Sequence, residues 1–65
     1  MNRLSKGVLR YGPLMVEPRL DGGYCEWRAW FGWRRAAASP VGRGSTSDEA
    51  VKDLLDRCDR RDEWS

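Results

Sequence analysis

The clearest pattern of apolar and polar positions lies near the end of the chain, in the sequence STSDEAVKDLLDRCDRRDEW. Apolar residues recur there at the spacing i, i+3, i+4 and i+7, which places them on one side of an α-helix. Thr46 and Glu49 have the spacing of a capping box, in which each side chain accepts the other residue's backbone N–H. We therefore expect a helix over about 47–61 with a solvated charged side. Its apolar side consists of Val51, Leu54, Leu55 and Cys58.

A β-hairpin is predicted in front of that helix, within LMVEPRLDGGYCEWRAWF. The Asp-Gly-Gly sequence at 21–23 tolerates the positive φ angles of a tight hairpin turn. Leu14, Val16 and Leu20 follow the period of two of a half-buried strand. Pro18 has no N–H to donate to a sheet, so this strand belongs at an edge or carries a bulge.

The second half of the hairpin continues into YCEWRAWFGWRR at 24–35, which also alternates as a strand does. One parity is mixed, and the other is wholly apolar and should face the core. A two-residue turn at Phe31 and Gly32 would return WRRAAAS antiparallel, with Trp27 opposite Ala36 and Trp33 beside Trp30. A helix over about 27–38 is the competing interpretation, which Gly32 and the alternation disfavour. The apolar parity consists of Cys25, Trp27, Ala29, Phe31 and Trp33.

Together these elements predict an α+β fold, with a three-stranded antiparallel β-meander and one C-terminal α-helix packed on one sheet face (βββα). The apolar side of the helix should face Trp27, Phe31 and either Leu14 or Val16. Sixty-five residues allow one small domain, 1–65, with loosely ordered ends at about 1–10 and 62–65. The strands are expected at about 13–20, 24–31 and 33–39.

Composition adds constraints on the core and on chemistry. Only 40% of the residues are hydrophobic, so at least two of the four tryptophans should fill the core. The chain has no histidine, the commonest general base and zinc ligand. Cys25 and Cys58 lie on apolar sides and are expected to be buried, reduced thiols. We expect no enzyme, no cofactor and no metal. No apolar run approaches 18 residues and no secretory signal is present, so we expect a cytoplasmic protein without a membrane partner.

Two segments resemble a known family. The sequence DGGY at 21–24 and the sequence GSTSDEAV at 44–51 resemble the hairpin turn and the "G-x-T-x-x-E-A" helix start of HicB-like antitoxin domains. The resemblance covers about 14–58 and implies a truncated double-stranded-RNA-binding-like fold. The stretch between Tyr24 and Thr46 is longer than is usual in that family, and its Pro-x-x-Pro-Gly-Cys segment is absent. The resemblance therefore supports the fold more than it supports toxin neutralisation.

Charge and aromatic residues indicate a binding surface. Residues 1–45 hold eight basic and three acidic residues, a net charge of +5, whereas residues 46–65 hold four basic and seven acidic ones, a net charge of −3. One helix covers only one sheet face, so arginines and aromatics of the other parity remain available to a partner. The expected partner-binding residues are Tyr24, Arg28, Trp30, Arg34, Arg35 and Arg43.

The favoured function is a protein-interaction module, an adaptor or inhibitor of phage or mobile-element type that acts on a host or toxin protein. The size of the chain and its lack of catalytic motifs suggest this class by analogy. The alternative is a nucleic-acid-binding protein that uses the basic aromatic sheet face, since arginines and aromatics also hold single strands. A homodimer is a further way to cover Trp30.

Overall fold

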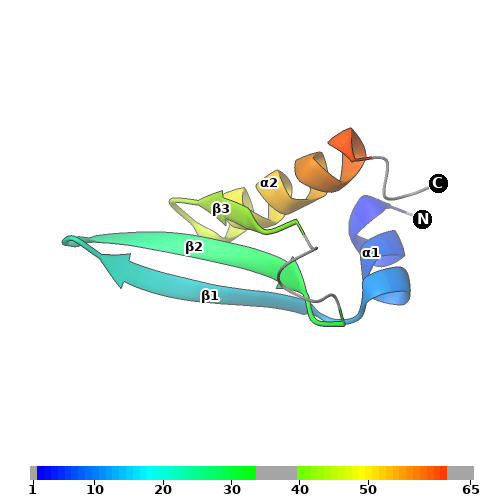
Figure 1. Cartoon of the computed structure of the whole chain (residues 1–65), viewed down its shortest axis with the longest axis horizontal. Coiled ribbons are helices and arrows are strands. Elements are labelled where there is room, and N and C mark those ends of the chain that lie inside the picture. The colour runs from blue at the N-terminus through cyan, green and yellow to red at the C-terminus, as the bar shows by residue number, and fades with distance from the viewer. Residues whose placement is uncertain (1, 34–39, 62–65) are drawn as a thin grey trace.

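The computed structural model describes residues 2–33 and 40–61. Three antiparallel strands form one sheet in the order β1-β2-β3, and two helices accompany it (Figure 1). The α+β meander followed by a C-terminal helix is confirmed, and a short N-terminal helix is added to it. The elements are α1 (Arg3–Tyr11), β1 (Leu14–Asp21), β2 (Tyr24–Phe31), β3 (Gly42–Gly44) and α2 (Ser47–Arg60).

The β1–β2 hairpin matches the prediction closely. Its register runs from Leu14 opposite Phe31 to Asp21 opposite Tyr24 without interruption. Gly22 and Gly23 have φ angles of 61° and 88°, the left-handed pair that a two-residue type I′ turn requires. Within the described residues the first strand pairs with β2 alone, so it is an edge strand, where a proline is tolerated.

The third strand lies later in the chain than predicted. Trp33 is part of a turn rather than the start of a strand, and its N–H donates to the carbonyl of Tyr11 at 2.8 Å. The predicted strand 33–39 is therefore wrong at its first residue, and residues 34–39 lie outside the described part of the chain. Instead β3 pairs with β2, with Gly42 opposite Ala29 and Gly44 opposite Trp27. Trp30 has Met15 as its strand partner, not Trp33.

The two glycines of β3 explain why this short segment, which has few side chains to pack, forms a strand. A Cβ atom on Gly42 would lie 2.1 Å from the carbonyl oxygen of Ala50 and 2.3 Å from the backbone nitrogen of Leu54. A Cβ on Gly44 would meet Glu49 at 2.5 Å. The strand passes directly against the backbone of α2, and only glycine permits an approach this close.

The C-terminal helix is as predicted, with one change at its cap. The Thr46 hydroxyl accepts the Glu49 N–H at 3.2 Å, as expected, but the Glu49 carboxylate accepts the N–H of Ser45 rather than that of Thr46. The expected apolar side faces the sheet, with Val51 half-buried. The buried helix residues are Ala50, Leu54, Leu55 and Cys58.

The N-terminal helix corrects the expectation that residues 1–10 are loosely ordered. Asn2 caps α1 by accepting the N–H of Ser5 at 2.8 Å. Gly7 is buried against the Phe31 ring, where a Cβ would lie 2.1 Å from the ring. Arg3 pairs with Asp56 at 3.1 Å and with Asp59, which fastens α1 to α2. A helix of nine residues is marginal by itself, so these tertiary contacts stabilise it.

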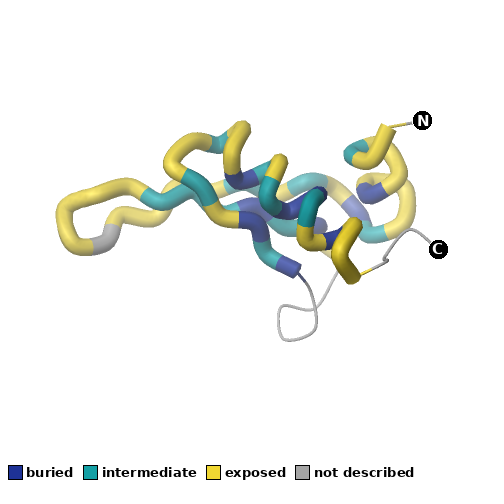
Figure 2. The backbone as a smooth tube through the Cα atoms, turned by 90° about the horizontal axis from the view of Figure 1, so that it is seen from above, coloured by how far each residue is buried: buried dark blue, intermediate teal, exposed yellow. Residues whose placement is uncertain are grey.

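The core lies where α1 and α2 both meet the Phe31 end of the sheet (Figure 2). Leu14, Val16 and Trp27 pack against it while remaining partly exposed. The expectation that tryptophans fill the core is wrong for the described residues, since Trp27 and Trp30 are half-buried and Trp33 is 71% exposed. The buried apolar residues are Ala29, Phe31, Ala50, Leu54, Leu55 and Cys58.

The two cysteines differ from each other in burial. Cys58 is 1% exposed, as predicted, whereas Cys25 is exposed, and neither forms a disulfide. The buried position predicted for Cys25 is wrong because the hairpin extends beyond the part of the sheet that the helices cover (Figure 1).

A candidate interaction surface and an arginine pocket

Among residues 2–33 and 40–61, no helix covers one face of the sheet, which we call the outer face (Figure 1). Side chains alternate between the two sides of a strand. The β2 residues of the parity opposite to Ala29 and Phe31, together with their strand partners, therefore point away from the core. Figure 1 shows α2 against the opposite face, and no described element lies across the outer face. By register, its residues are Met15, Glu17, Arg19, Glu26, Arg28, Trp30 and Arg43.

An apolar pair occupies one end of the outer face. Met15 and Trp30 are direct partners across the β1–β2 ladder. Met15 is 43% exposed and Trp30 is half-buried, so the sheet alone does not remove this pair from water. Directly opposed side chains on a sheet contact each other, and a thioether beside an aromatic ring forms an adaptable apolar surface.

Charges of both signs occupy the middle of the outer face. Arg28 pairs with Glu26 at 3.4 Å, and both side chains are about one-third exposed. On the neighbouring strand β1, the guanidinium group of Arg19 lies 3.9 Å from the carboxylate of Glu17. The strand partners of Arg28 are Glu17 on one side and Arg43 on the other. Arginine and glutamate therefore interleave, and most of the charge on this face is balanced.

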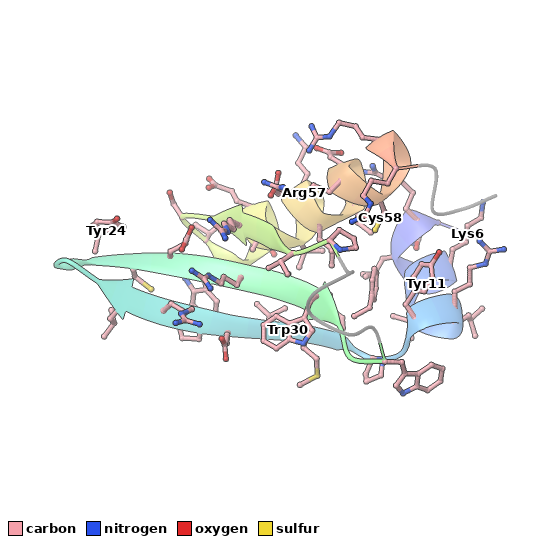
Figure 3. The ribbon with its side chains drawn as sticks, viewed as in Figure 1. Lys6, Tyr11, Tyr24, Trp30, Arg57 and Cys58 are labelled. Carbon is pink, nitrogen blue, oxygen red and sulfur yellow. The ribbon has the colours of Figure 1, made fainter. Side chains whose placement is uncertain are left out.

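Tyr24 lies apart from these residues, at the far end of the hairpin (Figure 3). It is six residues from Trp30 on one extended strand, a separation of about 20 Å at the usual rise per residue. Tyr24 is 65% exposed and Leu20 nearby on β1 is 85% exposed. The predicted site residues thus extend along the hairpin instead of forming one cluster, and Arg34 and Arg35 lie outside the described residues.

A second basic region was not predicted. A pocket of about 540 Å³ lies between the segment leading into β3 and the last turns of α2. We call it the arginine pocket. Its signal in the sequence is the spacing i, i+3, i+4 of three arginines in the last turn of α2 and at its C-cap, where the pattern predicts a solvated helix side. Its lining residues are Pro40, Val41, Arg43, Arg57, Arg60 and Arg61.

Asp53 connects the strand and helix sides of the arginine pocket. Its Oδ2 accepts the backbone N–H of Arg43 at 2.9 Å and Nε–H of Arg57 at 2.7 Å. Partial burial raises the pKa of Asp53, but these two hydrogen bonds and the charges of Arg57 and Arg60 outweigh burial. The pKa of Asp53 is therefore lowered from its ordinary value, and the carboxylate stays ionised at neutral pH.

No group of cysteines and carboxylates among residues 2–33 and 40–61 could hold a metal ion. Neither described helix has the length and apolar character that crossing a membrane requires. No family model, curated protein or solved structure matches this chain. The resemblance to HicB-like domains thus remains an expectation from two short sequence segments.

Proposed function

We propose that this protein is a small non-enzymatic interaction module that binds a protein partner through the outer face of its sheet. The observation that carries the proposal is the Met15–Trp30 pair, which lies beside balanced charges on a sheet face that no described helix covers. Apolar side chains bordered by paired charges are typical of a protein-binding surface.

The charges of the outer face favour a protein over a nucleic acid. A polyphosphate backbone requires unpaired cations, whereas Arg28 is paired with Glu26 and Arg19 lies near Glu17. Two carboxylates on this face would repel phosphates, yet they suit a protein surface that carries both signs. The expected partner surface has an apolar side chain that covers Met15 and Trp30, with charges that complement the interleaved pairs.

The class of partner follows from size and composition rather than from any catalytic feature. A chain of 65 residues without histidine suits an adaptor or an inhibitor that acts by occupying a surface of another protein. A phage or mobile-element factor that binds a host or toxin protein is the role we propose.

The experiment compares three forms of the immobilised protein in a bacterial lysate, with and without nuclease. The variant Met15→Ala/Trp30→Ala should keep its fold by circular dichroism and lose the captured protein, because the core residues are unchanged. Leu20→Ala, which truncates an equally apolar but remote residue, should retain it.

Each other outcome has a meaning. Capture that nuclease abolishes supports the nucleic-acid alternative. Self-association in sedimentation experiments that disappears in the double variant makes the outer face a homodimer interface. Capture that survives the double substitution excludes the outer face as the binding surface.

A further inference from the structure

The arginine pocket gathers cations from two separate elements. Arg57 and Arg60 lie on one side of α2 because they are spaced i and i+3, and Arg61 follows at the C-cap of the helix. Arg43 comes from β3, and Asp53 holds the backbone of this residue to α2. Figure 3 shows Arg57 on α2, on the other side of the hairpin from Trp30 in that view. The pocket therefore lies beside α2 at the edge strand β3, and Arg43 is the residue it shares with the outer face.

Among the described residues, two arginines of this pocket, Arg43 and Arg60, have no carboxylate paired with their guanidinium groups. Asp53 pairs with Arg57 through Nε at this pocket. Asp53 meets Arg43 only through the backbone N–H, and no ion pair among residues 2–33 and 40–61 engages the guanidinium groups of Arg43 or Arg60. The guanidinium groups of Arg43 and Arg60 therefore add positive charge to a pocket where Asp53 already pairs with Arg57. Like charges held close together are unfavourable unless an anion joins them.

The helix end explains only part of this arrangement. Arginines in the last turn of a helix interact well with its partial negative charge, which accounts for Arg57 and Arg60. It does not account for Arg43, which belongs to a strand and lines the same pocket.

The geometry points to an anion with several charges on one compact group. Arginine donates from a planar fork that matches the oxygens of phosphate, and two or more forks can bind one phosphate together. Phosphodiesters along a nucleic-acid strand carry one charge each and are spread out, whereas four arginines lie around one pocket here. The apolar residues Pro40 and Val41 add a surface for the organic part of a ligand.

We propose that the arginine pocket binds the terminal phosphate of a phosphate monoester or a pyrophosphate group. Arg43 and Arg60 supply the guanidinium groups that contact the anion, while Arg57 is oriented by Asp53 at the same pocket. The proposal does not depend on the function proposed for the outer face.

Calorimetric titration with pyrophosphate at low ionic strength tests this assignment. Arg43→Ala/Arg60→Ala should weaken binding at least tenfold, because two charge-assisted hydrogen-bonding groups are lost. Arg19→Ala/Arg28→Ala removes the same charge from the outer face and should change affinity less than threefold. Thermal melts establish that both variants are folded.

Two further ligands distinguish the sources of phosphate. A nucleoside monophosphate should bind with the same dependence on Arg43 and Arg60 as pyrophosphate. An oligonucleotide without a terminal phosphate should bind more weakly than pyrophosphate, and tighter binding that the pocket variant loses would replace the proposal with nucleic-acid binding. Equal losses in both double variants, or no pyrophosphate binding by the unchanged protein at millimolar concentration, would overturn it.

Discussion

The two ends of β2 have the same alternation but different surroundings. At one end Phe31 is 2% exposed, with Gly7 of α1 against its ring and the Tyr11 ring centroid 5.8 Å away. At the other end Cys25, which has the same parity, is exposed, and Tyr24 beside it is 65% exposed. Strand parity therefore decides which side of the sheet a residue takes, while the helices decide whether that side is buried.

This difference divides the protein into a stabilising end and an accessible end. Around Phe31 each side chain is held by elements distant in sequence, so substitutions there should affect stability. Toward the turn at Gly22 and Gly23 the hairpin stands without helices, and substitutions there should affect only what the surface contacts (Figure 2).

The largest expected effect is at the covered end of β2. Phe31→Ala should lower the free energy of unfolding by about 3–5 kcal/mol, because it removes a large buried ring and leaves a cavity between α1 and α2. Chemical denaturation measures the change. Tyr24→Ala on the same strand is the control, with an expected change within about 0.5 kcal/mol. Comparable losses in the two variants would contradict the division of β2.

The contact between β3 and α2 should respond to a single methyl group. Gly42→Ala places a Cβ against the helix backbone and should cost about 1–3 kcal/mol, because neither element can yield without losing hydrogen bonds. Arg43→Ala, at the adjacent position, should change the free energy of unfolding by less than about 0.5 kcal/mol. A Gly42→Ala variant as stable as the unchanged protein would show that α2 does not lie this close to the strand.

The contribution of Asp53 to the free energy of unfolding should depend on pH in the acid range. Its lowered pKa means that it stabilises the folded state fully above the ordinary carboxyl pKa of 3.8, and the contribution is lost as the pH falls through the lowered value. Asp53→Asn should cost about 1 kcal/mol near neutral pH. Urea denaturation across the acid range should show this difference shrinking toward zero. If the difference in the free energy of unfolding between the Asp53→Asn variant and the unchanged protein did not vary with pH, the loss of stability would come from packing and not from the carboxylate charge.

The smallest effect on stability is expected at the accessible end. Cys25→Ser should leave the free energy of unfolding unchanged within about 0.5 kcal/mol, because the side chain is already in water. Ellman's reagent should modify one thiol rapidly in the native protein and the second only on unfolding. The Cys25→Ser variant should lack the rapid phase, and a rapid phase that persists would mean that Cys58 is accessible.

Local patterns were sufficient for the parts of the fold that depend on near neighbours. The apolar spacing and cap of α2, the glycine turn of the hairpin and the outward parity of Arg28 and Trp30 all follow from residues within a few positions of one another. The exposure of Cys25 and the Met15–Trp30 pair required the covered length of the hairpin and its register, which strand alternation alone does not specify.

The sequence by itself determined the helix α2, the β1–β2 hairpin and the side of the sheet on which each residue of these two strands lies, because these depend on local periodicity and turn chemistry. Only the tertiary structure decided the position of β3, the formation of α1 and the arginine pocket. Gly42 is a strand residue because α2 lies against it, and α1 forms where Gly7 meets Phe31. Arg43 and Arg57 meet because Asp53 joins their elements. Such long-range contacts have no periodic signal, since each depends on two segments whose approach the packed core sets.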